Sequence, residues 1–239
     1  MEASDELLGN QNRGGLSAGE RVMKERMYAP QAFRVEDRER LQAFIAQVGF
    51  GLLVSGHSQG ASQSSWLPFL LSEDGQSLEG HLARANPQWK GWEKEAFVSV
   101  HFLGPHAYIS PNAYPAGPSV PTWNYAAARV DGEIEIVHDN ALRVEIVARL
   151  VEANEASQEP PWQFERDSEF VQGLLKAIVC FRINIRQICG SFKMSQNKEA
   201  GSRKRVIRYL KQSGGLLDQA CAAFMEGMDA DPTWKSGEA

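Results

Sequence analysis

Alternating apolar and polar positions dominate the first two thirds of this chain, in short runs separated by turn residues. Runs typical of β-strands occupy residues 50–55, 63–71, 77–83, 96–102 and 106–110. Residues rich in Gly, Ser and Asp mark turns at 57–60 and 73–76. A longer alternating pattern over 124–137 contains a turn signal at Asp131-Gly132, and residues 179–185 alternate again. Closely spaced strands of this kind predict an antiparallel barrel or sandwich.

Helical spacing of apolar residues appears between and after these strands. Leu41, Phe44, Ile45 and Val48 precede Gly49, which predicts a helix over 37–48. Asp139 is the predicted N-cap of a helix that runs to about Ala153, and a short helix is predicted near 168–176. Helical spacing returns through Leu210 and Met228, with Gly214-Gly215 between the two stretches. The order of elements predicts an α+β chain organised around a β-barrel.

Composition sets limits on the class of protein. The chain has 239 residues, 43% of them hydrophobic, which is enough for one domain, or one barrel with helical additions. A balance of 25 basic and 30 acidic residues gives a net charge of -5, so any contact with nucleic acid must be local. Cys180, Cys189 and Cys221 are odd in number and widely spaced, which disfavours disulfides and metal binding. We predict that Cys180 and Cys221 are buried in a protein of a reducing compartment.

The first 26 residues are polar and charged, without the apolar run of a signal peptide. We predict that they form a flexible extension. No later stretch reaches the length of a membrane span. The sequence therefore predicts a cytoplasmic protein with no membrane partner.

Four segments combine aromatic, cationic and amide side chains: Gly80–Trp89, Gly104–Ser110, Val120–Tyr125 and Lys193–Asn197. Together they resemble the PaiB family of FMN-binding, negative transcriptional regulators, over roughly Met27 to Met228. The resemblance implies the FMN-binding split barrel, a fold related to pyridoxamine-phosphate oxidases. It also implies a homodimer with FMN at the subunit interface.

The predicted fold class is therefore α+β: an antiparallel, Greek-key-like split β-barrel with flanking helices and a helical C-terminal part. The predicted organisation is an extension at 1–26, a split-barrel FMN-binding domain with inserted helices at 27–197, and a C-terminal helical segment and tail at 198–239.

The first segment offers donors for the flavin phosphate. Arg84 can supply a planar fork of charge-assisted hydrogen bonds, Asn86 and Gln88 add amides, and His81 lies nearby on the preceding strand. Taken by themselves, the same residues fit a turn at Asn86-Pro87 beside a solvated arginine better than they fit a phosphate site. The family resemblance favours contact with the cofactor.

The residues of the later segments also fit either cofactor binding or a structural role. Trp123 and Asn124 suit stacking and edge hydrogen bonding to a flat heterocycle, or packing at a barrel corner. Lys193, Ser195 and Gln196 suit the polar rim of an anionic cofactor. Alternatively, Ser195 or Asn197 is the N-cap of the next helix. We predict cofactor binding by Trp123, Asn124, Lys193, Ser195 and Gln196 together with the first segment.

One position departs from the family pattern. Where family members commonly have Thr-His-Leu-Pro, this chain has Ser65-Trp66-Leu67-Pro68. Trp66 can stack on the flavin ring, or its presence can mean a different ligand mode or a lost activity. The histidines His81, His101 and His106 do not form a spacing typical of metal ligands, so no metal is predicted and haem is a lesser alternative to FMN.

A basic run lies after the fourth segment and comprises Lys198, Arg203, Lys204, Arg205, Arg208 and Lys211. It is the one segment that can contact DNA phosphates by charge alone, although the residues themselves favour a solvated helix face. Three functions stay open: a dimeric flavin-binding regulator, an FMN-dependent oxidoreductase or haem-binding or haem-degrading split-barrel protein, and a binding module with a vestigial cleft. The sequence assigns no catalytic residue.

Overall fold

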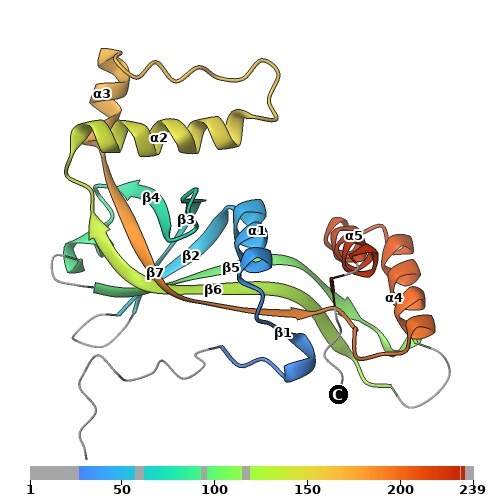
Figure 1. Ribbon diagram of the computed structural model, residues 1–239. Coiled ribbons are helices and arrows are strands. Elements are labelled where there is room, and N and C mark those ends of the chain that lie inside the picture. Colours follow the sequence, from blue (N-terminus) through green and yellow to red (C-terminus); the bar gives the residue numbers. More distant parts are fainter. Residues whose placement is uncertain (1–26, 57–61, 93–95, 115–118, 232, 235–239) are drawn as a thin grey trace, which may run out of the picture.

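Six antiparallel strands close into a barrel in the computed structural model, which describes residues 27–56, 62–92, 96–114, 119–231 and 233–234 (Figure 1). The order around the barrel is β7-β4-β3-β2-β5-β6, and β6 pairs with β7 to close it, while β1 pairs with β7 outside the ring. The strands are β1 (Arg34–Val35), β2 (Phe50–Ser55), β3 (Gln63–Leu71), β4 (Ser77–Ala83), β5 (Ala96–Ile109), β6 (Thr122–Ile136) and β7 (Ile178–Lys193). The predicted α+β split barrel is confirmed. The predicted extension at 1–26 and turn at 57–60 lie outside the described residues.

The helices begin and end where short-range chemistry predicts. They are α1 (Arg38–Val48), α2 (Asn140–Glu155), α3 (Glu169–Lys176), α4 (Ala200–Gln212) and α5 (Leu216–Ala230), with short 3-10 turns η1 (Gln31–Phe33), η2 (Pro87–Gly91) and η3 (Pro111–Ala113). The side chain of Asp37 accepts a hydrogen bond from the backbone of Arg40, and Gly49 ends α1 with a left-handed φ of 61°. Asp139 caps α2 in the same way.

One predicted cap is wrong. The sequence left Ser195 or Asn197 as the N-cap of the helix after β7, but α4 begins after Glu199, which makes no side-chain cap hydrogen bond. The chain between Lys193 and α4 instead makes a turn in which Ser195 has a φ of 58°.

Two glycine positions predicted as corners or turns lie inside continuous strands. The predicted strands 96–102 and 106–110 are one strand, β5, whose register against β6 shifts between Leu103 and His106. A side chain at Gly104 would lie 2.7 Å from the Phe44 ring. The Asp131-Gly132 pair is likewise the site of a register shift, here between β6 and β7. A Cβ at Gly132 would lie 2.4 Å from the Asn184 carbonyl oxygen. Close approach of the Phe44 ring at Gly104 and of the β7 backbone at Gly132, and not chain reversal, requires glycine at these two sites.

The barrel interior is filled by apolar side chains from every strand of the ring. Buried examples are Leu53, Phe69, Leu78, Val100, Phe102, Val130, Phe181 and Phe192. Helix α1 contributes Leu41, Phe44 and Ile45 to the same core. Leu41 fits because Gly190 on β7 has no side chain, and a Cβ there would lie 2.1 Å from it.

Helix α2 covers the outside of β4 and β7 with a second apolar cluster that includes Ile146, Leu150 and Cys180. Beside it, buried Glu79 accepts hydrogen bonds from Arg182, at 2.7 Å, and from Arg149 of α2. A buried carboxylate is stable here because two guanidinium groups compensate its charge. Cys180 and Cys221 are buried, as predicted.

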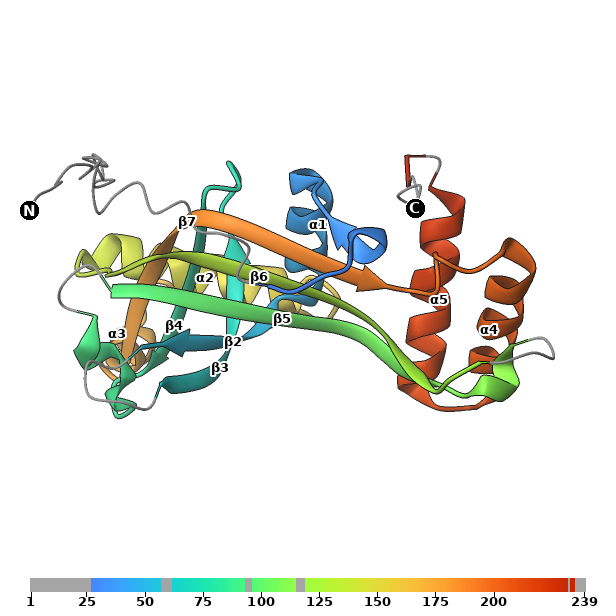
Figure 2. The same ribbon diagram turned by 90° about the horizontal axis from the view of Figure 1, so that it is seen from below.

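The long strands β5, β6 and β7 extend beyond the barrel to α4 and α5 (Figures 1 and 2). Buried Arg203 of α4 holds this junction together. Its guanidinium donates to the carbonyl oxygens of Met194 and Met225 and pairs with Asp229, with an Nε–Oδ1 distance of 2.7 Å. One residue of the predicted basic run is therefore structural. Across the described ranges, no helix is long and apolar enough to cross a membrane.

Replacing Arg203 by Met is expected to lower the free energy of unfolding by about 2–4 kcal/mol, because two buried carbonyls and Asp229 lose their donor. Urea unfolding followed by circular dichroism measures the change. The control is Lys204→Met, which removes an exposed charge from the same helix and is expected to change stability by less than about 0.5 kcal/mol. Equal effects of the two substitutions would contradict the structural role of Arg203.

Candidate functional site

One row of side chains crosses the outside of the barrel on neighbouring strands. Trp66 of β3 pairs with Leu52 of β2, Leu52 with His101 of β5, and His101 with Arg129 of β6. Directly paired residues share a face of the sheet, so these four side chains lie side by side. They line a cavity of about 400 Å³ with Leu103 and neighbouring residues. We call this solvent-facing side of β2, β3, β5 and β6 the outer face, and its hollow the outer-face cavity.

The outer face exposes large apolar side chains that a soluble protein normally buries. Trp66 is 57% exposed and stacks on Phe50, with ring centroids 5.9 Å apart. The same face continues along β5 and β6 to Tyr108 and Trp123, whose rings lie 6.0 Å apart. An extended exposed patch of this kind marks a binding surface.

A polar group lies at the centre of this apolar face. Arg129 donates to the buried carboxylate of Asp131, with an Nη2–Oδ1 distance of 2.8 Å, and to the Ser99 hydroxyl. Burial lowers the pKa of His101, and the Arg129 charge lowers it further, which keeps the imidazole neutral near pH 7. The other carboxylate oxygen of Asp131 is buried without a hydrogen-bond partner.

The outer-face cavity has the chemistry that a flavin ring requires. An isoalloxazine has two apolar faces and a polar edge, and the cavity offers aliphatic and indole surface beside guanidinium and imidazole groups. Leu52, Trp66 and Leu103 would contact the faces of the ring, while Arg129 and His101 would lie at its edge. The residues present therefore fit the ring portion of FMN.

The first predicted segment closes one end of the barrel. The Arg84 guanidinium donates through Nε to the carbonyl of Lys176 and through Nη2 to that of Ile178, each at 2.8 Å. Asn86 caps η2 through its side-chain oxygen and donates to the Ser65 hydroxyl. The side chain of Gln88 is buried and bonded to residues of β2 and β3. Asn86 and Gln88 thus hold the barrel end in place, while the Nη1 donors of Arg84 have no hydrogen-bond partner among the described residues.

His81 lies apart from these residues. It pairs with Cys180 across β4 and β7, on the side of the sheet that α2 covers. Its Nδ1 is buried without a hydrogen-bond partner, and burial lowers its pKa. His81 therefore faces away from the barrel core, and the sequence gave no sign that a helix occupies that side.

Trp123 and Asn124 point to opposite sides of β6. Trp123 is exposed on the outer face, whereas Asn124 is fully buried and its amide donates to the Ser195 hydroxyl at 3.0 Å. Successive residues of a strand alternate between faces, so one flavin on the outer face would contact Trp123 and not Asn124.

The last predicted segment forms a separate polar site at the far end of the long strands. Lys193 bonds the Thr122 hydroxyl, and Lys198 lies over the Tyr114 ring at 5.5 Å. Both lysines line a cavity of about 220 Å³ that also includes Ser195, which we call the lysine cavity. Gln196 instead closes its own turn through hydrogen bonds to Met194 and Phe192.

Within one chain, the nine predicted residues therefore lie in several places. The structure brings Asn124, Lys193 and Ser195 together, and Arg84, Asn86 and Gln88 together, but it joins neither group to His81. Sequence reasoning missed Leu52, Leu103 and Arg129 as outer-face residues. Apolar residues on both faces of β2 were the signal that could have found them, because a strand with only one buried face alternates apolar with polar residues.

Comparisons with known proteins agree on the family. A family model described as "Putative FMN-binding domain" matches residues 27–187. The Bacillus subtilis (strain 168) protein named "Protease synthase and sporulation protein PAI 2" is 32% identical over 202 residues, covering 84% of this chain and 97% of the relative. A protein of Emericella nidulans, named as uncharacterized, is 34% identical over 191 residues, covering 64% of this chain and 76% of the relative.

Solved structures share the fold at low sequence identity. The FAD and heme binding protein from Mycobacterium smegmatis has a TM-score of 0.55 at 12% identity, covering 76% of this chain and 80% of that chain. The flavocytochrome Anf3 from Azotobacter vinelandii has a TM-score of 0.52 at 13% identity, covering 70% and 73%. The family description names FMN, the cofactor that the sequence predicted. The chain belongs to the PaiB family of FMN-binding split-barrel proteins.

Proposed function

We propose that this protein is a cytoplasmic homodimer that holds FMN against the outer face, between two subunits, and acts as a negative regulator of transcription. The observation that carries the proposal is the exposed row of Trp66, Leu52, His101 and Arg129 around the outer-face cavity, in a member of an FMN-binding family. When bound, FMN supplies redox chemistry. Its flat ring is also a ligand whose binding depends on the conformation of the protein. This chain's own residues bind and orient it.

The exposed aromatic patch supports a dimer. Phe50, Trp66, Leu103, Tyr108 and Trp123 share one face, and a second copy of that face would remove them from water. Two-fold symmetry would also account for the fact that the predicted site residues lie in several places within one chain. An axis crossing the outer face would carry the lysine cavity of one subunit towards the outer-face cavity of the other, so that ring and phosphate bind to different chains.

The lysine cavity suits the phosphate end of FMN. A dianionic phosphate needs charge-assisted donors, and Lys193 and Lys198 bring two ammonium groups to a small cavity with the Ser195 hydroxyl. The Nη1 donors of Arg84, which have no partner in the part of the chain that the structure describes, offer a second position for the same group. Placement in the cytoplasm is supported by Cys180 and Cys221, which are buried as thiols.

The regulatory role is supported by the exposed face of α4. Lys204, Arg205 and Arg208 point to solvent, while Val206, Ile207 and Leu210 are buried. A dimer would present two such basic faces, which is the arrangement that contacts DNA phosphates on two half-sites.

A haem-binding or oxidoreductase function is the second candidate, and His101 favours it. A neutral imidazole at the rim of the outer-face cavity is suited to bind haem iron. A protein of the same fold, from Mycobacterium smegmatis, is named as binding both FAD and haem. Absorbance spectroscopy separates the two candidates, because haem gives an intense Soret band and flavin does not.

Sedimentation tests the dimer. Wild type is expected to sediment at twice the 26.5 kDa chain mass, and Leu103→Asp, which puts a charge into the apolar patch, as a monomer. Leu174→Asp on α3 is the matched control, because Leu103 and Leu174 are 50% and 51% exposed. A dimer that survives Leu103→Asp would exclude the outer face as the interface.

Flavin fluorescence quenching tests the phosphate site. Lys193→Gln is expected to weaken FMN binding about tenfold, the usual loss for one charge-assisted hydrogen bond. Riboflavin, which lacks the phosphate, should bind wild type and Lys193→Gln equally. Lys176→Gln, which removes an exposed lysine of α3, serves as the control. If Lys193→Gln weakens FMN and riboflavin alike, Lys193 does not bind the phosphate.

Salt titration of DNA binding tests the regulatory role. Arg205→Gln is expected to weaken binding to promoter DNA and to reduce the slope of log affinity against log salt by about one unit per contact removed. Lys176→Gln again provides the control. Affinity that does not respond to salt, in wild type or variant, would count against α4 as the DNA contact.

A further inference from the structure

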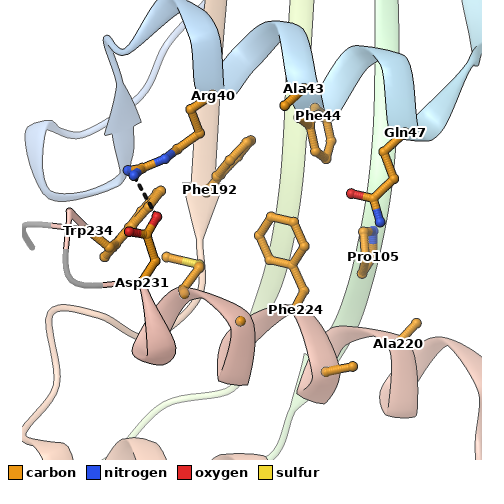
Figure 3. A pocket seen from close by; sticks show the side chains of 13 residues that line it. Arg40, Ala43, Phe44, Gln47, Pro105, Phe192, Ala220, Phe224, Asp231 and Trp234 are labelled. Carbon is orange, nitrogen blue, oxygen red and sulfur yellow. Dashed lines mark hydrogen bonds and ion pairs between the residues drawn. The ribbon is translucent and has the colours of Figure 1, made fainter.

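A cavity lies between α1 and α5, away from the outer face (Figure 3). Its volume is about 550 Å³, which is within the usual range for small-molecule sites. Helix α1 forms one wall and α5 the other, while Phe192 of β7 and Pro105 of β5 lie behind them. We call it the helix cavity.

Aromatic rings form most of its inner surface. Phe192 is the centre of the group, with ring centroids 4.9 Å from Phe44, 5.3 Å from Phe224 and 5.9 Å from Trp234. The rings of Phe192 and Trp234 are nearly parallel, at 7°. Rings at these angles offer both faces and edges, so a flat aromatic guest can stack or make edge contacts there.

Small residues on α5 keep the helix cavity open. Ala220, Ala223 and Gly227 follow one another along the side of α5 that faces α1. A Cβ added at Gly227 meets no heavy atom within 4 Å, so the empty space reaches the helix backbone. A larger side chain at this position would enter the cavity.

The polar end of the helix cavity is formed by Arg40 and its hydrogen-bond partners. Arg40 donates through Nη2 to Asp231 and to the Thr233 hydroxyl, both at 2.8 Å, and its guanidinium lies 4.4 Å from the Trp234 ring centroid. Asp231 has both carboxylate oxygens engaged, because Thr233 donates its N–H and its hydroxyl to the second oxygen. These hydrogen bonds, chiefly from Thr233, lower the pKa of Asp231 and keep it ionised.

Arg40 and Asp231 therefore differ in the hydrogen bonds that they can make with a ligand. Both carboxylate oxygens of Asp231 already accept hydrogen bonds, whereas the Nη1 and Nε donors of Arg40 have no hydrogen-bond partner among the described residues. Arg40 is held in position by the Trp234 ring and the ion pair, and it is only partly exposed. An arginine fixed in this way recognises a planar acceptor group, and above all a carboxylate.

We infer that the helix cavity is a second ligand site, which takes a flat aromatic carboxylate. The ring system lies among Phe44, Phe192 and Phe224, and the carboxylate accepts hydrogen bonds from Arg40. Because Asp231 offsets part of the Arg40 charge, apolar burial provides most of the affinity and the carboxylate provides selectivity. The site is separate from the proposed flavin site and does not depend on it.

Isothermal titration of the full-length protein with 2-naphthoate tests this site. Wild type is expected to bind one molecule per chain, and the uncharged analogue 2-naphthamide about three- to tenfold more weakly, because it loses the charge-assisted hydrogen bond. Gly227→Leu, which fills the cavity, is expected to weaken naphthoate binding at least about tenfold. Ala223→Leu, on the same wall, should act in the same direction.

The matched control is Gly173→Leu. Gly173 is also a helical glycine whose added Cβ meets nothing within 4 Å, but it lies on α3, away from the helix cavity. The two glycine substitutions raise helix propensity alike, so only Gly227→Leu should change naphthoate affinity. FMN affinity should be the same in all these variants, which separates this site from the flavin site.

Two results would overturn the inference. One is the absence of saturable naphthoate binding to folded wild-type protein up to about millimolar concentration, the weak limit for a specific site of this size. The other is naphthoate affinity that neither Gly227→Leu nor Ala223→Leu changes, with both variants shown to be folded by circular dichroism. Loss of FMN binding alone would affect only the proposed function.

Discussion

The structure depends on the long antiparallel pairing of β6 with β5 on one side and β7 on the other. Because β6 is paired with β5 from Thr122 to Ile134 and with β7 from Tyr125 to Ile136, each side chain in this stretch is fixed on either the interior or the outer face. The interior face completes the barrel core. The opposite face carries Arg129 and Trp123 towards solvent. Beyond the barrel it is the interior side of β6 that contacts α5, where the Asn124 amide meets the Met225 sulfur.

Three glycines make this pairing, and the packing of α1 against the sheet, possible. A side chain at Gly132 or Gly190 would overlap a neighbouring strand or Leu41, and one at Gly104 would overlap Phe44. Glycine here provides close approach in the interior of the fold. The same residue type in a turn has a different role, which is why Asp131-Gly132 was interpreted as a turn signal within the strand-like pattern and proved to be a register shift.

Local patterns could be predicted well from the sequence because they depend on neighbours in the chain. Asp37 and Asp139 cap their helices, and the strands at 50–55, 63–71 and 77–83 have the predicted bounds. The site could not be predicted equally well, since it depends on which element covers which face. His81 is covered by α2, and the donors of Asn86 and Gln88 serve the barrel end. The resemblance identified the family and cofactor, while the outer-face residues Leu52 and Arg129 became visible only through strand register.

FMN bound between two subunits of this barrel is the feature on which the proposed function rests. Its most direct test is size-exclusion chromatography of the protein mixed with FMN, with visible absorbance recorded across the eluted peak. We expect flavin absorbance to elute with a dimer, at about one flavin per chain, as two equivalent sites in a symmetric pair require. A monomer that elutes apart from free FMN would contradict this binding mode.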